Sequence, residues 1–164
     1  MAHPKIGNMA PAFSLKDQNG DTVSLKDFKG KKNVLLYFYP KAKTPGCTVQ
    51  ALGIRNSHKD FAKLDTVVLA VSPDPVAKLK KFEENPQKEQ APLNFTLLSD
   101  EDHAIADKYG AWGPKKFMGR EFDGILRSSF VIGKDGRLKY IMDKVKTKTH
   151  DQDILDVIKS LDLD

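Results

Sequence analysis

Two continuous apolar runs constrain the fold of this chain more than any other feature. NVLLYFY occupies residues 33–39 and TVVLAVS occupies residues 66–72. Runs of this length without polar alternation are typical of strands that are buried on both faces. The segment between them, from Cys47 to about residue 64, is predicted to be helical, with Gly53 as a weak point inside it. Buried strands that are connected through helices indicate an α/β fold.

Both ends of the chain carry hairpin signals. Residues 13–25 alternate in polarity around Asn19-Gly20, which is a strong signal for a tight turn. Residues 127–133 and 137–143 flank a KDG turn and form a second predicted hairpin. Together with the two buried runs, these hairpins predict a mixed central sheet that is flanked by helices.

Further helices are predicted from their end signals. Asp74 is a suitable N-cap with Pro75 at the first helical position, and Ser99 is expected to open a helix that Gly110 closes. The last helix should begin near Asp151. Residues 111–126 are predicted to be irregular, because glycine, lysine and aromatic residues follow one another there without a clear period.

Composition limits the possible classes of protein. A chain of 164 residues, 40% of them hydrophobic, fits one domain over residues 1–164. The formal charge is +5, but lysines alternate with acids, so no basic stripe for nucleic acid is expected. We also expect no membrane span and no secretory leader, and therefore a cytoplasmic location. A single cysteine excludes an internal disulfide.

The segment YFYPKAKTPGCT, residues 37–48, carries the chemical signal. It places Cys47 where a helix begins, directly after a buried strand. Free N–H groups and the helix dipole favour negative charge at such a position, and the thiolate is the reactive form of cysteine. A lone cysteine is more often a small buried hydrophobe, but a Thr-Pro-Gly turn is an unusual setting for a residue that only fills a core.

PKAKTPGCT resembles the active-site loop of the peroxiredoxins, and KAKTPGCTVQA is similar to their bacterioferritin comigratory protein (PrxQ) subfamily. NFTLLSDEDHAIADKYGAWGPKKFMGREFDGILRSSFVIGKDG is also similar to that subfamily, so the resemblance covers nearly the whole chain. It implies a thioredoxin-like fold with an N-terminal hairpin. It further implies that Cys47 is the peroxidatic cysteine, that Thr44 is its hydroxyl partner, that Pro40 shields the site, and that Arg127 is the active-site arginine.

These residue types suit peroxide reduction. A free thiol with a pKa of about 8.5 is only about 3% ionised at pH 7, and even complete ionisation would lower the barrier by only about 2 kcal/mol. Donors aimed at the leaving oxygen must supply the rest. Arg127 and the main-chain N–H groups of Gly46 and Cys47 are expected to be those donors, and Thr44 is expected to accept the peroxide proton. Trp112 and Phe117 could form an apolar rim that admits organic hydroperoxides.

The sequence departs from many PrxQ members at Leu52, where those relatives carry a resolving cysteine five residues after the first. We therefore hypothesise a one-cysteine cycle in which Cys47 becomes a sulfenic acid that an external thiol reduces. Thioredoxin, glutaredoxin and glutathione are the candidate reductants. The resemblance favours a monomer, and no cofactor is expected.

Other functions fit the sequence less well. A thiol–disulfide oxidoreductase normally needs Cys-x-x-Cys, but Thr44 and Gln50 stand three residues before and after Cys47. A non-enzymatic redox sensor or chaperone that is switched by oxidation of Cys47 is the main alternative, and a scaffold without activity is another. The four histidines are scattered, so no metal site is expected.

Overall fold

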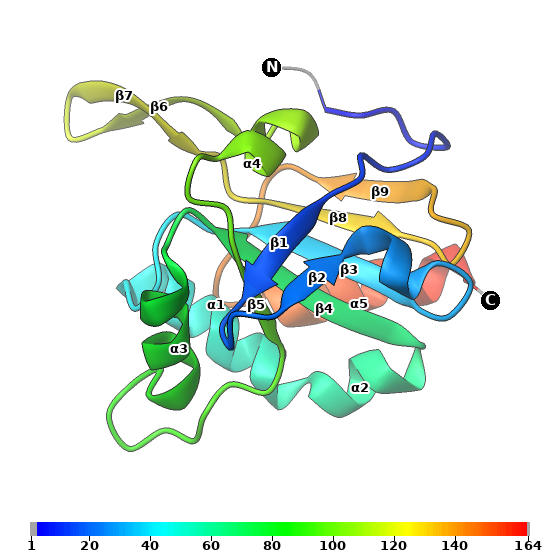
Figure 1. Ribbon diagram of the computed structural model, residues 1–164, viewed down its shortest axis with the longest axis horizontal. Helices are drawn as coiled ribbons and strands as arrows, with labels where there is room; N and C mark the ends of the chain where they lie inside the picture. Colours follow the sequence, from blue (N-terminus) through cyan, green and yellow to red (C-terminus); the bar gives the residue numbers. More distant parts are fainter. Residues whose placement is uncertain (1–2, 164) are drawn as a thin grey trace.

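The computed structural model describes residues 3–163 (Figure 1). The helices and strands follow one another in the order β1 (Ser14–Asp17), β2 (Thr22–Ser24), the 3-10 helix η1 (Leu25–Phe28), β3 (Asn33–Phe38), α1 (Pro45–Asn56), α2 (His58–Lys63), β4 (Thr66–Ser72), α3 (Val76–Glu84), β5 (Thr96–Ser99), α4 (Ala104–Tyr109), β6 (Trp112–Phe117), β7 (Arg120–Ile125), β8 (Ser128–Ile132), β9 (Leu138–Met142) and α5 (His150–Leu161).

The strands form a mixed sheet of seven strands in the order β2-β1-β5-β4-β3-β8-β9. The two apolar runs of the sequence are β3 and β4, which pair in parallel at the centre, and β5 is parallel to β4. The hairpins β1-β2 and β8-β9 complete the two sides, and both are antiparallel. The predicted mixed sheet with an N-terminal hairpin is therefore confirmed.

The core has two parts, one on each face of the sheet. Alternate residues of β3 point to opposite faces: Leu35 and Tyr37 belong to one cluster, and Leu36 and Phe38 belong to the other. The first cluster includes buried residues of α1, α2, α3 and α5, and the second includes those of α4 (Figure 1). Because both faces of β3 are covered, this strand can be apolar throughout its length.

The prediction for residues 111–126 is wrong. They form a two-stranded antiparallel hairpin, β6-β7, which extends away from the main sheet (Figure 1). The turn is Met118-Gly119, and both residues have positive φ, of 51° and 78°. The residues near this turn are mostly exposed on both sides, which explains why the alternation of apolar and polar residues that identifies a half-buried strand is missing.

The predicted helix from Cys47 to about residue 64 is in fact two helices, and the break lies at Ser57 instead of Gly53. The Ser57 hydroxyl donates a hydrogen bond of 2.7 Å to Asp151 of α5. Gly53 continues the helix and allows α5 to approach, because a Cβ on Gly53 would lie 3.1 Å from Asp151 Oδ1.

Two predicted helix caps are also wrong. Asp74 does not cap α3, because Pro75 occupies the N-cap and the Asp74 carboxylate binds elsewhere. Ser99 does not cap α4. Instead, the Asp100 carboxylate accepts hydrogen bonds from the N–H groups of Ile105 and Ala106 at 3.2 and 3.0 Å. Gly110 closes α4 in the left-handed conformation, as predicted. No helix within residues 3–163 has the length and apolar character needed to cross a membrane.

Candidate active site

The end of β3 and the beginning of α1 position Cys47. After β3, the N–H of Tyr39 continues the pairing with β4 through a hydrogen bond of 3.0 Å to Val71 O. The chain then turns through Pro40, and Thr44 becomes the N-cap of α1 with an extended backbone, φ −79° and ψ 155°. Pro45 occupies the first helical position, where its missing N–H costs nothing. Cys47 thus lies in the first turn of α1.

The first turn of α1 presents unused donors. The first hydrogen bond within the helix runs from Thr48 N to Thr44 O at 2.9 Å. The N–H groups of Gly46 and Cys47 come before it and have no acceptor within the helix. They carry the positive end of the helix dipole, which favours an anion beside them. Their role as donors to a bound peroxide stays a prediction.

Arg127 reaches Cys47 from the neighbouring strand. β8 pairs antiparallel with β3 and places Ser128 opposite Phe38, so Arg127 arrives just past the C-terminal end of β3. Both terminal nitrogens of its guanidinium, Nη1 and Nη2, lie 3.5 Å from Cys47 Sγ. The side chain passes close to the helix start, since a Cβ on Gly46 would lie 3.5 Å from Arg127 Nη2. Two residues that are 80 positions apart in sequence are therefore in direct contact.

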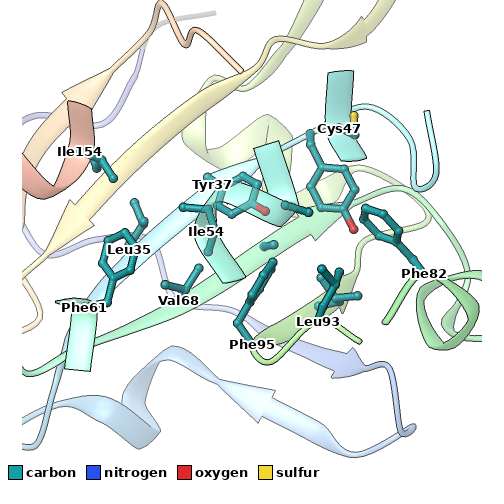
Figure 2. Close-up of a cluster of buried hydrophobic side chains, with 14 of the residues drawn as sticks. Leu35, Tyr37, Cys47, Ile54, Phe61, Val68, Phe82, Leu93, Phe95 and Ile154 are labelled. Atoms are coloured by element: carbon teal, nitrogen blue, oxygen red, sulfur yellow. The ribbon is translucent and has the colours of Figure 1, made fainter. Parts of the chain in front are cut away.

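The sulfur of Cys47 is almost fully enclosed, because only 2% of the residue is exposed. Cys47 belongs to the apolar cluster that contains Tyr37, Tyr39 and Ala51. Figure 2 shows Cys47 at one edge of this cluster, with Ile154 and Phe61 at the opposite end. Apolar side chains thus limit water on one side of the sulfur, and the guanidinium supplies charge next to it. This combination strengthens electrostatic interactions at the sulfur.

Thr44 and Pro40 both lie in the loop before Cys47. The Thr44 hydroxyl donates a hydrogen bond of 2.8 Å to Lys41 O, so its oxygen lone pairs remain available to accept a proton from a bound molecule. Pro40 is half-buried and lies two residues after the end of β3. Within residues 3–163, no hydrogen bond joins the Thr44 hydroxyl to the Cys47 sulfur.

Asp74 holds this loop in place. The sequence analysis predicted instead that Asp74 caps a helix. Its Oδ2 accepts hydrogen bonds from Ala42 N at 2.7 Å and from the Ser72 hydroxyl at 2.8 Å. Only 6% of Asp74 is exposed. The carboxylate therefore ties the loop between β3 and α1 to the end of β4. A spacing of 32 residues between Asp74 and Ala42 gives no local signal for this contact.

Two more residues near the guanidinium were missed by the sequence analysis. Gln50, one helical turn after Cys47, accepts a hydrogen bond of 2.6 Å from Arg127 Nη1 through its Oε1. Lys115 of β6 is half-buried, and burial together with the charge of Arg127 lowers its pKa. The position of Gln50 three residues after Cys47 was a usable signal, because this spacing places both on one face of a helix.

Both residues of the predicted aromatic rim lie on β6. Phe117 lies at the exposed end of β6, with 67% of its surface accessible. Trp112, at the start of the same strand, stacks on the ring of His103 with a centroid distance of 3.7 Å. In the described part of the chain, no group of three or more His, Cys, Asp or Glu side chains could hold a metal ion.

Comparison with known proteins agrees with this geometry. Residues 6–141 match the AhpC/TSA family. A putative peroxiredoxin of Haemophilus influenzae is 53% identical over 156 residues, which cover 95% of this chain and 97% of the relative. Peroxiredoxin Bcp of Escherichia coli is 50% identical over 155 residues, which cover 94% and 96% of the two chains.

Solved structures resemble the fold over the same extent. A mutant of PrxQ from Xylella fastidiosa matches with a TM-score of 0.86 and 27% identity, covering 98% of both chains. Peroxidoxin BcpB of Mycobacterium tuberculosis matches with a TM-score of 0.81 and 30% identity, covering 96% of this chain and 98% of its own. The predicted thioredoxin-like fold is thereby confirmed. With its only cysteine at the start of α1, the chain belongs to the AhpC/TSA family and, within it, to the Bcp/PrxQ peroxiredoxins.

Proposed function

We propose that this peroxiredoxin reduces hydrogen peroxide and organic hydroperoxides at Cys47 and that an external thiol returns Cys47 to its starting state. The observation that carries the proposal is the contact of both guanidinium nitrogens of Arg127 with the Cys47 sulfur at 3.5 Å. A permanent cation beside the sulfur stabilises the thiolate. The same cation is placed to stabilise the oxygen that leaves during the reaction.

The first step transfers one oxygen atom to sulfur. The Cys47 thiolate attacks the nearer peroxide oxygen, an S–O bond forms and the O–O bond breaks. The electron pair of the broken bond leaves on the second oxygen as hydroxide or alkoxide, which takes up a proton to become water or an alcohol. The sulfur is oxidised to a sulfenic acid and the peroxide is reduced.

The loop residues have distinct roles in this step. The Thr44 hydroxyl, which donates to Lys41 O, accepts a hydrogen bond from the O–H of the hydroperoxide and so holds the substrate beside the sulfur. The N–H groups of Gly46 and Cys47 donate to the peroxide oxygens. Pro40 limits the access of water. Trp112 and Phe117 contact the organic group of larger hydroperoxides.

The second half of the cycle needs a thiol from another molecule, because the chain contains one cysteine. One external thiol condenses with the sulfenic acid to a mixed disulfide and releases water, and a second thiol reduces that disulfide. Leu52 occupies the resolving position and packs against the apolar cluster around Cys47. Thioredoxin, glutaredoxin or glutathione serves as the reductant. An enclosed sulfur also disfavours a Cys47–Cys47 disulfide between two chains, which fits a monomer.

A solved relative supports the substrate class. The bacterioferritin comigratory protein of Xanthomonas campestris, which has an alkyl peroxide reduction activity, is 29% identical to this chain. Its structure matches with a TM-score of 0.81 and covers 90% of each chain. A cytoplasmic location would supply the thiol reductants that this cycle needs.

A steady-state assay tests the proposal. Purified protein is supplied with hydrogen peroxide or cumene hydroperoxide and either a thioredoxin system or a glutathione–glutaredoxin system, with Cys47→Ser as the blank. We expect turnover with at least one reductant and none in the blank. Turnover that persists in Cys47→Ser contradicts the proposal.

The same assay separates the enzyme from the main alternative. A redox sensor or chaperone consumes one equivalent of peroxide and then stops, whatever thiol is present, whereas an enzyme continues until the thiol is exhausted. A single stoichiometric burst with every reductant would therefore overturn the one-cysteine cycle and favour the sensor.

A further inference from the structure

A line of buried hydrogen bonds continues from Arg127 away from Cys47. Gln50 accepts a hydrogen bond from Arg127 Nη1 at 2.6 Å, and Gln50 Nε2 lies 3.0 Å from His150 Nδ1. On the other side of the imidazole, His150 Nε2 lies 2.6 Å from the Ser129 hydroxyl. Gln50 is 1% exposed, and His150 and Ser129 are 0% exposed. The line thus connects the reactive sulfur, through the half-buried Arg127 and then through buried side chains, to the first residue of α5.

The chemistry of the groups fixes the direction of each hydrogen bond. A guanidinium can only donate, so the amide oxygen of Gln50 must face Arg127 and its NH2 group must face His150. Nδ1 of His150 is therefore the acceptor and carries no proton. In a neutral imidazole the proton then lies on Nε2, which donates to the Ser129 hydroxyl.

The surroundings of the imidazole keep it neutral. The ring meets Tyr37 edge to face, with a centroid distance of 5.2 Å and an interplanar angle of 71°. Burial, helped by the positive charge of Arg127, lowers the pKa of His150 to about 4, although Asp151 and Asp153 act in the opposite direction. The ring is consequently neutral at physiological pH.

We propose that His150 is a positioning residue of the peroxidase site, which holds the Arg127 guanidinium against the Cys47 sulfur by fixing the orientation of the Gln50 amide. This inference rests on the proposed function, whose cysteine and arginine it supports. Reversing the Gln50 amide would place its NH2 group against the guanidinium, two donors with no acceptor between them. In the observed orientation the Gln50 oxygen accepts from Arg127 and its NH2 group donates to Nδ1 of His150, so His150 completes the one arrangement in which both ends of the amide are paired.

Removal of the Nδ1 acceptor weakens the preference of the Gln50 amide for this orientation. The Gln50 NH2 group is then buried without a partner, and this cost favours any rearrangement that gives it one. Such a rearrangement removes the Gln50 oxygen that accepts the hydrogen bond of Arg127 Nη1. The guanidinium then spends less time on the sulfur, so the peroxide reaction becomes slower even in a fully folded protein.

Two variants of equal shape test this idea. Leu and Asn side chains have the same number of heavy atoms in the same branched arrangement, so His150→Leu and His150→Asn are similar in shape. Only the Asn side chain offers an oxygen at the place of Nδ1. We expect the second-order rate of Cys47 oxidation by hydrogen peroxide to fall about 5- to 10-fold in His150→Leu, the effect of one lost hydrogen bond. The rate in His150→Asn should recover most of this loss.

A second readout does not depend on peroxidase activity. Iodoacetamide reacts with the thiolate, so the rate at which it alkylates Cys47 at a fixed pH reports how well the site stabilises that form. This rate should fall in His150→Leu and return toward the wild-type value in His150→Asn. If the wild type shows no turnover with any peroxide and reductant while the alkylation rate still changes in this way, the proposed function fails and the positioning role stands.

A matched control separates positioning from general destabilisation. Ser57→Ala removes the hydrogen bond of 2.7 Å to Asp151, which also connects to α5 but lies outside the line to Arg127. It should lower the urea midpoint without changing the peroxide rate. Equal rates in folded wild type, His150→Leu and His150→Asn would overturn the proposal, as would a rate in His150→Asn as low as that in His150→Leu. If His150→Leu does not fold, His150→Phe, which keeps the ring shape without nitrogen, replaces it in the comparison.

Discussion

The buried imidazole of His150 makes the stability of the fold depend on pH, and the size of the effect follows from its environment. Burial lowers the pKa of His150 to about 4 in the folded protein, whereas an exposed histidine titrates near pH 6.5. Between these two values the unfolded chain holds a proton that the folded chain does not. The free energy of unfolding must therefore decrease as the pH falls from 6.5 toward 4. The contribution is fully present only above pH 6.5.

Linkage gives the magnitude. For a group whose pKa drops from 6.5 to about 4, acidification from pH 7 to pH 5 lowers the free energy of unfolding by about 2 kcal/mol. Urea denaturation of wild type and His150→Leu at both pH values measures it. The other histidines are present in both proteins, so their contributions cancel in the comparison.

We expect the wild type to lose about 2 kcal/mol more than His150→Leu between pH 7 and pH 5. Equal losses in the two proteins, within about 0.5 kcal/mol, would refute the reasoning, because they would mean that the imidazole titrates alike in the folded and unfolded chains. His150→Asn should behave like His150→Leu in this experiment, since neither carries a titratable group at this position.

Three further predictions concern the site itself. Replacing the guanidinium in Arg127→Leu should slow the oxidation of Cys47 by peroxide about 100-fold or more. The control Arg55→Leu, at the far end of α1, should leave this rate unchanged. Equal rates in the two variants would show that Arg127 has no part in the mechanism. Leu52→Cys should give a protein that loses two hydrogens after one equivalent of peroxide, as measured by intact mass, because the new thiol condenses with the sulfenic acid; Lys63→Cys, exposed on α2, should not. Phe117→Ser should raise the KM for cumene hydroperoxide and leave that for hydrogen peroxide unchanged, and no change for either substrate would show that the hairpin does not contact substrate.

The central part of the fold could be predicted because its signals are local. β3 and β4 are unbroken apolar runs, and a strand buried on both faces needs no information from elsewhere in the chain. The turn before Cys47 was equally visible, since proline and glycine end a strand and begin a helix by their backbone geometry alone. The contact of Arg127 with Cys47 was expected only through the resemblance, because 80 residues separate the two.

The parts that were missed depend on partners that are distant in sequence. The hairpin β6-β7 extends away from the main sheet, so the residues near its turn show no buried face. Asp74 has the sequence context of a helix cap, but its carboxylate binds the loop at Ala42. His150 has nothing in its own helix to distinguish it from the other histidines. Its partners Gln50 and Ser129 are 100 and 21 residues away.

Intact mass measurement of the oxidised protein tests the central claim most directly. Wild-type protein and Cys47→Ser are each mixed with one equivalent of hydrogen peroxide, and a thiol reductant is then added. The account predicts that only the wild type gains one oxygen, that peptide mapping places it on Cys47, and that the thiol removes it. Oxygen found on methionine while Cys47 remains unmodified, or an oxidised Cys47 that no thiol restores, would contradict it.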